Sequence, residues 1–252
     1  MNAQGRTIDL NADLGEGVGD DTAMLAIVSS ANIACGAHAG GPEEMSAAMS
    51  TAKSRNVTLG AHPGYADRAN FGRIVVSMNE SAIERLIAHQ LGAAMGVAAL
   101  AGTRIAYVKT HGALYNLAAV DGQVAQAIAR AVRAVDPNLT ILCPALSMAE
   151  RAAKAAGIKT ASEVFADRAY RPDGTLVPRS DPGAVIHDPA TVVARTVEML
   201  TTNEITAIDG SRLRLKMDSI CLHGDTPGAV RLAQTLRTAL QAEGWRIAPF
   251  AQ

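Results

Sequence analysis

Four histidines in this sequence each close an apolar run and are followed within two residues by glycine or proline. They are His38, His62, His111 and His223. An earlier run over residues 7–17 carries two acids close to its end, Asp13 and Glu16. Imidazoles and carboxylates exchange protons near neutral pH, so these residue types point to general acid–base chemistry. One such histidine is usually structural, whereas four at equivalent positions indicate a shared site.

The run over residues 7–17 begins as a strand with one apolar and one polar face. Its apolar side chains alternate with Asp9, Asn11 and Asp13. Because successive side chains of a strand point to opposite faces, the three polar groups lie together. A half-buried surface strand has the same pattern. The glycine-rich turn that carries Glu16 and the later histidine segments favour the site instead.

A lysine adds a charge to this set. Lys109 and His111 are two residues apart on one predicted strand and share its face. An ammonium group facing the interior is costly unless it is paired, and Asp13, Glu16 or Glu163 would be the natural partner. The alternative is a lysine whose amine reaches out to solvent. We therefore assign catalysis to Asp13, Glu16, His62, Lys109 and His111.

Arginines could hold the carboxylate of a substrate. Arg168 follows the polar pair Glu163 and Asp167, and Arg73 and Arg179 lie in other loops. Guanidinium groups bind carboxylates bidentately, although a surface role is the default for any single arginine. The residues that we assign to substrate binding are His38, Arg73, Glu163, Asp167, Arg168, Arg179, His223 and Asp225.

Two other signals are weak. Gly15, Gly17 and Gly19 follow a strand, but their spacing matches neither the dinucleotide fingerprint nor the phosphate loop of nucleotide hydrolases. Cys35 and Cys221 stand near strand ends beside histidines and could be nucleophiles, yet small buried thiols are more common. The three cysteines are odd in number and lack metal-type spacing, which favours reduced thiols in the cytoplasm.

The elements that must position these groups alternate between strand-like and helical runs. The predicted strands are 7–13, 30–35, 57–62, 104–110, 140–144, 159–165 and 217–223, with 245–250 as a weaker eighth. The predicted helices are 20–28, 42–55, 78–101, 121–135, 146–156, 189–200 and 227–243. Seven or eight such units favour a closed parallel β/α barrel with its catalytic groups at the carboxyl ends of the strands, and an open sheet is the alternative.

Helix start signals support three of these boundaries. Pro42 is followed by two glutamates, Asp188 precedes Pro189, and Ser77 with Glu80 fits a capping box. We expect residues 1–252 to form a single barrel domain. Two departures from the repeat are expected within it, a long loop at about 167–188 and a hairpin at about 204–215.

Composition excludes several classes of partner. A net charge of −1 and 3% aromatic residues offer neither phosphate neutralisation nor stacking platforms, so we expect no nucleic acid. The longest apolar run, residues 91–101, falls short of the roughly 20 residues that span a bilayer. Residues 1–6 lead directly into the first strand, so we expect no secretion and a cytoplasmic location.

Seven segments in chain order resemble the LamB/YcsF family. They are Asn11–Gly17, Ala31–Gly40, Gly60–Tyr65, Phe71–Arg73, Val108–Asn116, Glu163–Tyr170 and His223–Asp225. The resemblance implies a distorted seven-stranded β/α barrel related to the glycoside hydrolase and polysaccharide deacetylase barrels. It also implies ATP-dependent opening of 5-oxoproline to L-glutamate with separate B and C subunits, ATP being accompanied by Mg²⁺.

The residues supply parts for that reaction. Asp13 or Glu16 would act as the base toward water, and His62 or His111 as the acid toward the leaving nitrogen. Lys109 would stabilise developing negative charge. The alternatives are a metal-dependent amidase or deacetylase and a non-catalytic scaffold subunit.

The sequence argues against a tightly bound metal ion. Deacetylase barrels bind their metal with two adjacent aspartates, and here Leu14 follows Asp13. We therefore expect no tightly bound metal, although Asp13, His38 and His62 form a possible ligand set. The chain also has Ala12 and Gly41 where the family usually has cysteine and aspartate, so neither of those side chains is essential if the activity is retained.

Overall fold

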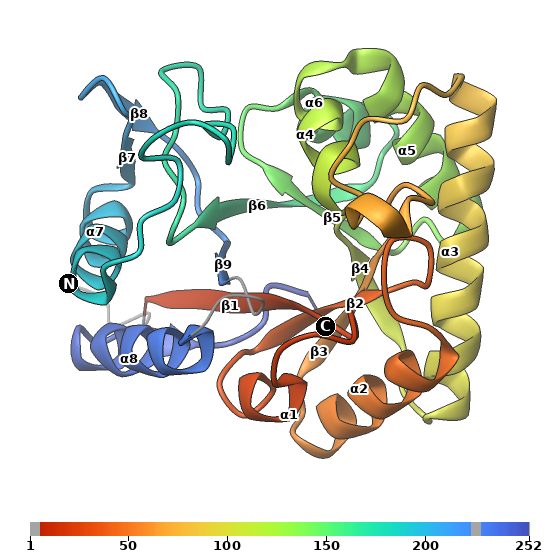
Figure 1. Cartoon of the computed structure of the whole chain (residues 1–252), viewed down its shortest axis with the longest axis horizontal. Coiled ribbons are helices and arrows are strands. Elements are labelled where there is room, and N and C mark those ends of the chain that lie inside the picture. The colour runs from red at the N-terminus through yellow and green to blue at the C-terminus, as the bar shows by residue number, and fades with distance from the viewer. Residues whose placement is uncertain (1–5, 223–227, 252) are drawn as a thin grey trace.

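The computed structural model describes residues 6–222 and 228–251, and its centre is a closed barrel of seven parallel strands (Figure 1). The strands pair in the order β1-β2-β3-β4-β5-β6-β9, and β9 pairs back onto β1. Their bounds are β1 Thr7–Leu14, β2 Ser30–Ala34, β3 Thr58–His62, β4 Ile105–Val108, β5 Thr140–Pro144, β6 Lys159–Phe165 and β9 Ser219–Leu222. The barrel predicted from the sequence is confirmed over the open sheet.

Both faces of β1 are buried. Leu10 and Ala12 belong to the apolar core that packs against the helices. Asp9 and Asn11 are also fully enclosed, and Asn11 donates from Nδ2 to Ser219 Oγ at 2.7 Å. The alternation predicted from the sequence is therefore a division between an apolar exterior and a polar barrel interior, so the surface-strand interpretation is wrong.

An aromatic ring fills part of the barrel interior. Tyr107 of β4 is fully buried, and its hydroxyl donates to Asn32 Oδ1 at 2.6 Å. A β-carbon on Gly60 of the neighbouring strand would overlap this ring. Glycine at that position is what allows a large side chain to lie inside a narrow barrel.

Helices surround the barrel, with the long α3 along one side and α7 beside α8 on the other (Figure 1). Their bounds are α1 Asp21–Met24, α2 Pro42–Ser54, α3 Glu80–Leu100, α4 Gly112–Val120, α5 Gly122–Val135, α6 Met148–Ala155, α7 Pro189–Thr202 and α8 Ala229–Ala242, with a 3₁₀ turn, η1, at Arg68–Asn70. Within the described ranges, none of the helices has the length and apolar content needed to cross a membrane.

The helix starts at Pro42 and at Asp188–Pro189 are confirmed. The capping box at Ser77 is wrong, because Asn79 caps α3 and accepts from Ala82 N at 2.9 Å. The predicted helix 20–28 shortens to the four residues of α1. Helix α4 was not expected, since its N-cap His111 makes no side-chain capping hydrogen bond.

Two segments interrupt the repeat where the sequence predicted them. Residues 167–188 are tied together by backbone bridges from Arg168 to Val185 and from Tyr170 to Leu176. Strands β7 (Glu204–Thr206) and β8 (Arg212–Arg214) form the hairpin. The two segments touch, because Ile208 N donates to Tyr170 O at 2.8 Å. The weak eighth strand is β10, Arg246–Ile247, which pairs in parallel with Thr7 and Ile8 at the start of β1.

Candidate active site

A cavity of about 740 Å³ opens where the barrel strands end. Asp13 comes from β1, His62 from the end of β3, and Glu163 from β6. Lys109 and His111 follow the end of β4, which stops at Val108 instead of residue 110 as predicted. All five line the cavity, so strand ends that are distant in sequence deliver their polar groups to one space.

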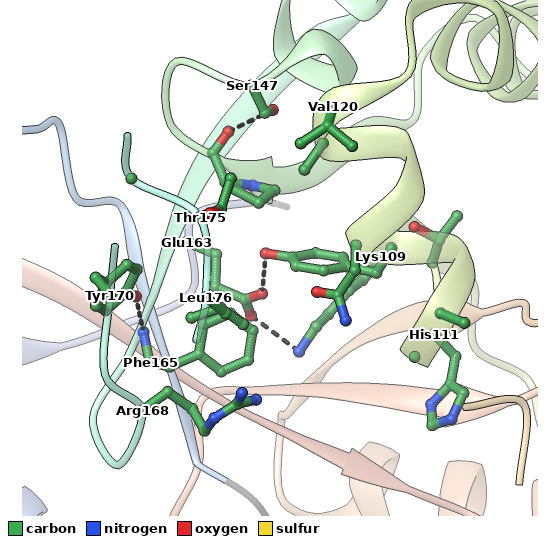
Figure 2. Close-up of a pocket in the computed structure, with 18 of the residues that line it drawn as sticks. Lys109, His111, Val120, Ser147, Glu163, Phe165, Arg168, Tyr170, Thr175 and Leu176 are labelled. Atoms are coloured by element: carbon green, nitrogen blue, oxygen red, sulfur yellow. Dashed lines mark hydrogen bonds and ion pairs between the residues drawn. The ribbon is translucent and has the colours of Figure 1, made fainter. Parts of the chain in front are cut away.

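Lys109 forms ion pairs with Asp13 and Glu163 inside this cavity, and Figure 2 shows the pair with Glu163. Its Nζ lies 2.9 Å from Glu163 Oε1, 3.1 Å from Asp13 Oδ1 and 3.1 Å from Cys221 Sγ. Burial alone would lower the pKa of Lys109, but Asp13, Cys221 and Glu163 raise it well above its ordinary value. Lys109 is 2% exposed and its amine is protonated. The predicted pairing with a carboxylate is therefore confirmed, and the alternative that its amine reaches solvent is wrong.

Glu163 has both carboxylate oxygens engaged (Figure 2). Its Oε1 accepts from Asn11 Nδ2 at 2.8 Å as well as from Lys109, and its Oε2 accepts from the Tyr115 hydroxyl at 2.8 Å. Neither Asn11, which was expected only on the polar face of the first strand, nor Tyr115 was predicted to contact Glu163. Tyr115 follows His111 by four residues, one turn of the unpredicted helix α4.

Two imidazoles meet with their ring nitrogens facing each other. His62 Nδ1 lies 2.8 Å from the carbonyl oxygen of Lys109, and His111 Nε2 lies 2.8 Å from that of Phe71. A carbonyl oxygen only accepts, so each of these nitrogens carries the proton and donates it. The remaining nitrogens, His62 Nε2 and His111 Nδ1, are 3.0 Å apart, and in the neutral form of both rings they carry lone pairs.

Glu16 and His38 complete this group. Glu16 Oε1 lies 3.5 Å from His111 Nδ1 and 3.3 Å from His38 Nε2. The ring of His38 is stacked on that of His111, with centroids 3.7 Å apart and planes 5° from parallel. Burial lowers the pKa of His38 to about 3 and that of His111 to about 2, with neighbouring imidazoles adding to the effect. Both rings are neutral at physiological pH.

The backbone at Phe71 and Gly72 presents the carbonyl that holds His111. Phe71 has φ of 54°, a left-handed conformation that costs a side-chain-bearing residue about 1–2 kcal/mol. Gly72 has φ of 62°, and a β-carbon there would lie 2.8 Å from His38 Cβ. The chain holds a strained turn next to the imidazoles, as binding sites commonly do.

Arginines line the cavity as the sequence suggested. Arg73, Arg168 and Arg179 are all on its wall, and so are Arg151 and Arg171, which the sequence analysis did not select. Part of the Arg168 guanidinium stabilises the fold. Its Nη2 donates to the carbonyl of Val177 at 2.6 Å, and its Nε donates to the carbonyl of Ala184 at 3.2 Å. The exposed Arg73 and Arg179 are better placed to meet a ligand.

Two of the expected site residues that the structure describes do not line the cavity. His38 is behind the cavity wall, and Asp167 is buried with its carbonyl accepting from Ile186 N at 2.8 Å. Neither belongs to the described lining of the cavity. His223 and Asp225 lie outside the described residues.

The glycine turn and the cysteines have structural roles. Gly15 N donates to Asp21 Oδ2 at 2.9 Å, so this amide is already satisfied within the protein. Burial raises the pKa of the Cys35 thiol to about 12 and that of Cys221 well above its ordinary value. Neither thiol forms a thiolate nucleophile at neutral pH.

Known proteins resemble this chain over nearly its whole length. It is 49% identical to the A subunit of 5-oxoprolinase from Rhodopseudomonas palustris strain BisB18, with 97% of this chain and 98% of that protein covered. It is 48% identical to the A subunit of 5-oxoprolinase from Paracidovorax citrulli, with 97% and 99% covered. The word subunit in these names implies a multi-subunit assembly for those proteins.

Solved structures support the same relationship. The lactam utilization protein from Thermus thermophilus superimposes with a TM-score of 0.91 at 36% identity, covering 97% of this chain and 100% of that one. The T48 deacetylase shares the barrel, with a TM-score of 0.51 at 13% identity over 98% of this chain and 89% of that one. The LamB/YcsF family model matches residues 8–252. This chain belongs to the LamB/YcsF family.

Proposed function

We propose that this chain is the A subunit of an ATP-dependent 5-oxoprolinase, which cleaves 5-oxo-L-proline to L-glutamate together with B and C subunits. The observation that carries the proposal is the 49% identity over 97% of the chain to a protein named as the A subunit of 5-oxoprolinase. The cavity is compatible with it, because it combines an ammonium group, carboxylates and imidazoles in about 740 Å³.

The chemistry explains why ATP would be needed. A five-membered lactam is an unstrained amide, and its nitrogen is a poor leaving group. Transfer of the γ-phosphoryl group of ATP to the amide oxygen activates the ring carbon toward water. Water then adds at that carbon, and the C–N bond breaks as the nitrogen takes up a proton, which leaves an acyl phosphate. A second water hydrolyses the acyl phosphate to L-glutamate and phosphate. ATP with Mg²⁺ is thus the cosubstrate of the complex.

The cavity offers a group for each of these needs. The Lys109 ammonium faces the space and would stabilise negative charge on the amide oxygen or its phosphoryl group. Asp13 or Glu16 would take the proton of the attacking water, and His62 or His111 would return one to the nitrogen. Arg73 and Arg179 would hold the substrate carboxylate.

The setting of the reaction follows from the same residues. The chain has three free cysteines, all buried. Unpaired thiols and a requirement for ATP are both typical of the cytoplasm, which we propose as the location. The B and C subunits are the expected partners.

The test is to combine this chain with its B and C partners, MgATP and 5-oxoproline and to measure L-glutamate. We expect glutamate and ADP in equal amounts, and a loss of at least about 100-fold in kcat for Lys109→Met. Lys53→Met, on the exposed face of α2, is the matched control and should leave the rate unchanged. No glutamate with partners shown to be competent would remove the proposal.

A metal-dependent amidase is the second candidate, and the grouping of Glu16, His62 and His111 favours it. That enzyme would hydrolyse an amide without ATP and would lose activity to a chelator. A scaffold subunit would instead keep full complex activity when Asp13 or His62 is replaced by alanine. Dependence on ATP separates the first two candidates, and the activity of the Asp13 and His62 variants separates the scaffold from both.

A further inference from the structure

We propose that His62, His111 and Glu16 bind a divalent transition-metal cation of the Zn²⁺ type. The proposal replaces the metal-free site expected from the sequence, and its ligands differ from the set of Asp13, His38 and His62 considered there. Binding of the ion is independent of the proposed function, and only its use in lactam opening rests on that function.

The first argument is the opposition of two lone pairs. His62 and His111 each donate one N–H to a backbone carbonyl, so in the neutral form of both rings the nitrogens that face each other at 3.0 Å both carry lone pairs. Two such lone pairs repel each other, and a cation bound by both nitrogens removes the repulsion without protonating either ring. Metal-binding histidines typically donate their other N–H to a carbonyl or carboxylate, and both rings do so here.

The second argument is the position of the carboxylate. Donors about 2.0–2.2 Å from one tetrahedral ion lie roughly 3.3–3.5 Å apart. Glu16 Oε1 is 3.5 Å from His111 Nδ1, and ligand atoms of Glu16, His62, His111 and His38 all lie within 4.8 Å of one another. Two imidazoles and a carboxylate around an open position are a common donor set for transition metals.

His38 is a positioning residue in this arrangement. Its ring is parallel to that of His111, so its nitrogen cannot point in its own plane toward the ion that His111 binds. Its Nε2 instead donates to Glu16 Oε1 at 3.3 Å, and its Nδ1 is left buried without a hydrogen-bond partner. The three proposed ligands line the cavity, whereas His38 does not.

The open side of the site faces the cavity. A Zn²⁺-type ion there would polarise a carbonyl oxygen or lower the pKa of a bound water toward 7. Asp13 stands beside the site, with Oδ1 3.4 Å from His62 Nε2 and 3.1 Å from Lys109 Nζ. It is placed to accept a proton from a group bound at the open position.

The experiment titrates the full chain, stripped of metal by a chelator and dialysed, with Zn²⁺ in a calorimeter and with Co²⁺ in a spectrophotometer. We expect one ion per chain and Co²⁺ absorption bands of low coordination number. His62→Asn and His111→Asn should each lower the affinity by more than about 100-fold, and His38→Gln by about 10–100-fold. His89→Gln, on α3 away from the cluster, is the matched control.

Several results would overturn the proposal. The first is that the chain takes up neither ion although its unfolding temperature shows that it is folded. The second is that the double variant of His62 and His111 still takes up an ion. Activity separates this proposal from the proposed function. Full glutamate production by the stripped complex would refute a role of the ion in lactam opening and leave the oxoprolinase standing. One bound ion with no glutamate would support the metal site and remove the proposed function.

Discussion

Lys109 and Glu163 form an ion pair of 2.9 Å across the barrel although 54 positions separate them in the chain. Each residue is 2% exposed. Desolvating a charge costs several kcal/mol, so each of these buried groups is tolerable only because it is paired. The pair therefore ties the end of β4 to β6 and holds an ammonium group at the cavity.

Replacing Glu163 by glutamine should lower the free energy of unfolding by about 3 kcal/mol, because it leaves part of the buried Lys109 charge uncompensated. Urea unfolding at pH 7 measures this. The control is Glu80→Gln, which breaks an exposed ion pair with Arg130 and should cost less than about 1 kcal/mol. Equal losses in the two variants would contradict the view that burial sets the strength of the pair.

Tyr115→Phe should lower stability by about 1–3 kcal/mol, because it removes the hydroxyl that donates to Glu163 Oε2 inside the protein. The loss should be smaller in the Glu163→Gln background, where the acceptor is no longer charged. A double-mutant cycle measures the coupling between the two residues. Additive losses would show that the hydroxyl serves packing alone.

Asp9 makes stability depend on pH. Burial raises its pKa from 3.8 to about 6, against the effect of hydrogen bonds from Ser219, Ser29 and Ser30. A group whose pKa is raised in the folded state binds its proton more tightly there, so its stabilising contribution is full below pH 3.8 and is lost as the pH rises through 6. The shift corresponds to about 3 kcal/mol at neutral pH.

Asp9→Asn removes this titration. The stability of the variant relative to the original chain should therefore rise between pH 4 and pH 7, as measured by urea unfolding at several pH values. Groups common to both chains cancel in the difference. A difference that stays constant over that range would show that Asp9 does not change its protonation there.

Gly60→Ala should destabilise the barrel by about 1–3 kcal/mol, because the added methyl overlaps the ring of Tyr107. Gly96→Ala is the control, since Gly96 lies within α3 with no atom within 4 Å of the added carbon. The control should gain up to about 1 kcal/mol from helix propensity. Thermal unfolding of both variants checks the opposite signs, and a shift of the same sign in both would contradict them.

Arg73→Met should raise the KM for 5-oxoproline about tenfold in the reconstituted complex and change kcat less, because it removes one of the charged contacts that we propose for the substrate carboxylate. The control is Arg85→Met on the exposed face of α3. An unchanged KM would assign the carboxylate to Arg179 or Arg168 instead.

The local sequence pattern determined the strands of the barrel and the face on which their polar side chains lie. The alternation of strand and helix signals predicted seven barrel strands, and the alternation within β1 predicted a polar face that the structure places inside the barrel. The positions of Asp13, His62 and His111 after apolar runs predicted that they would meet, since parallel strands end at the same edge.

Tertiary structure decided which groups pair. Strand stagger and closure set whether Lys109 meets Asp13, Glu16 or Glu163, and they bring in Tyr115 from a helix with no start signal. Backbone carbonyls at Phe71 and Lys109 select the ring tautomers that turn two histidines into potential metal ligands. Periodicity determines the face on which a side chain lies, but a contact across the barrel depends on distances that exist only once the ring of strands has closed.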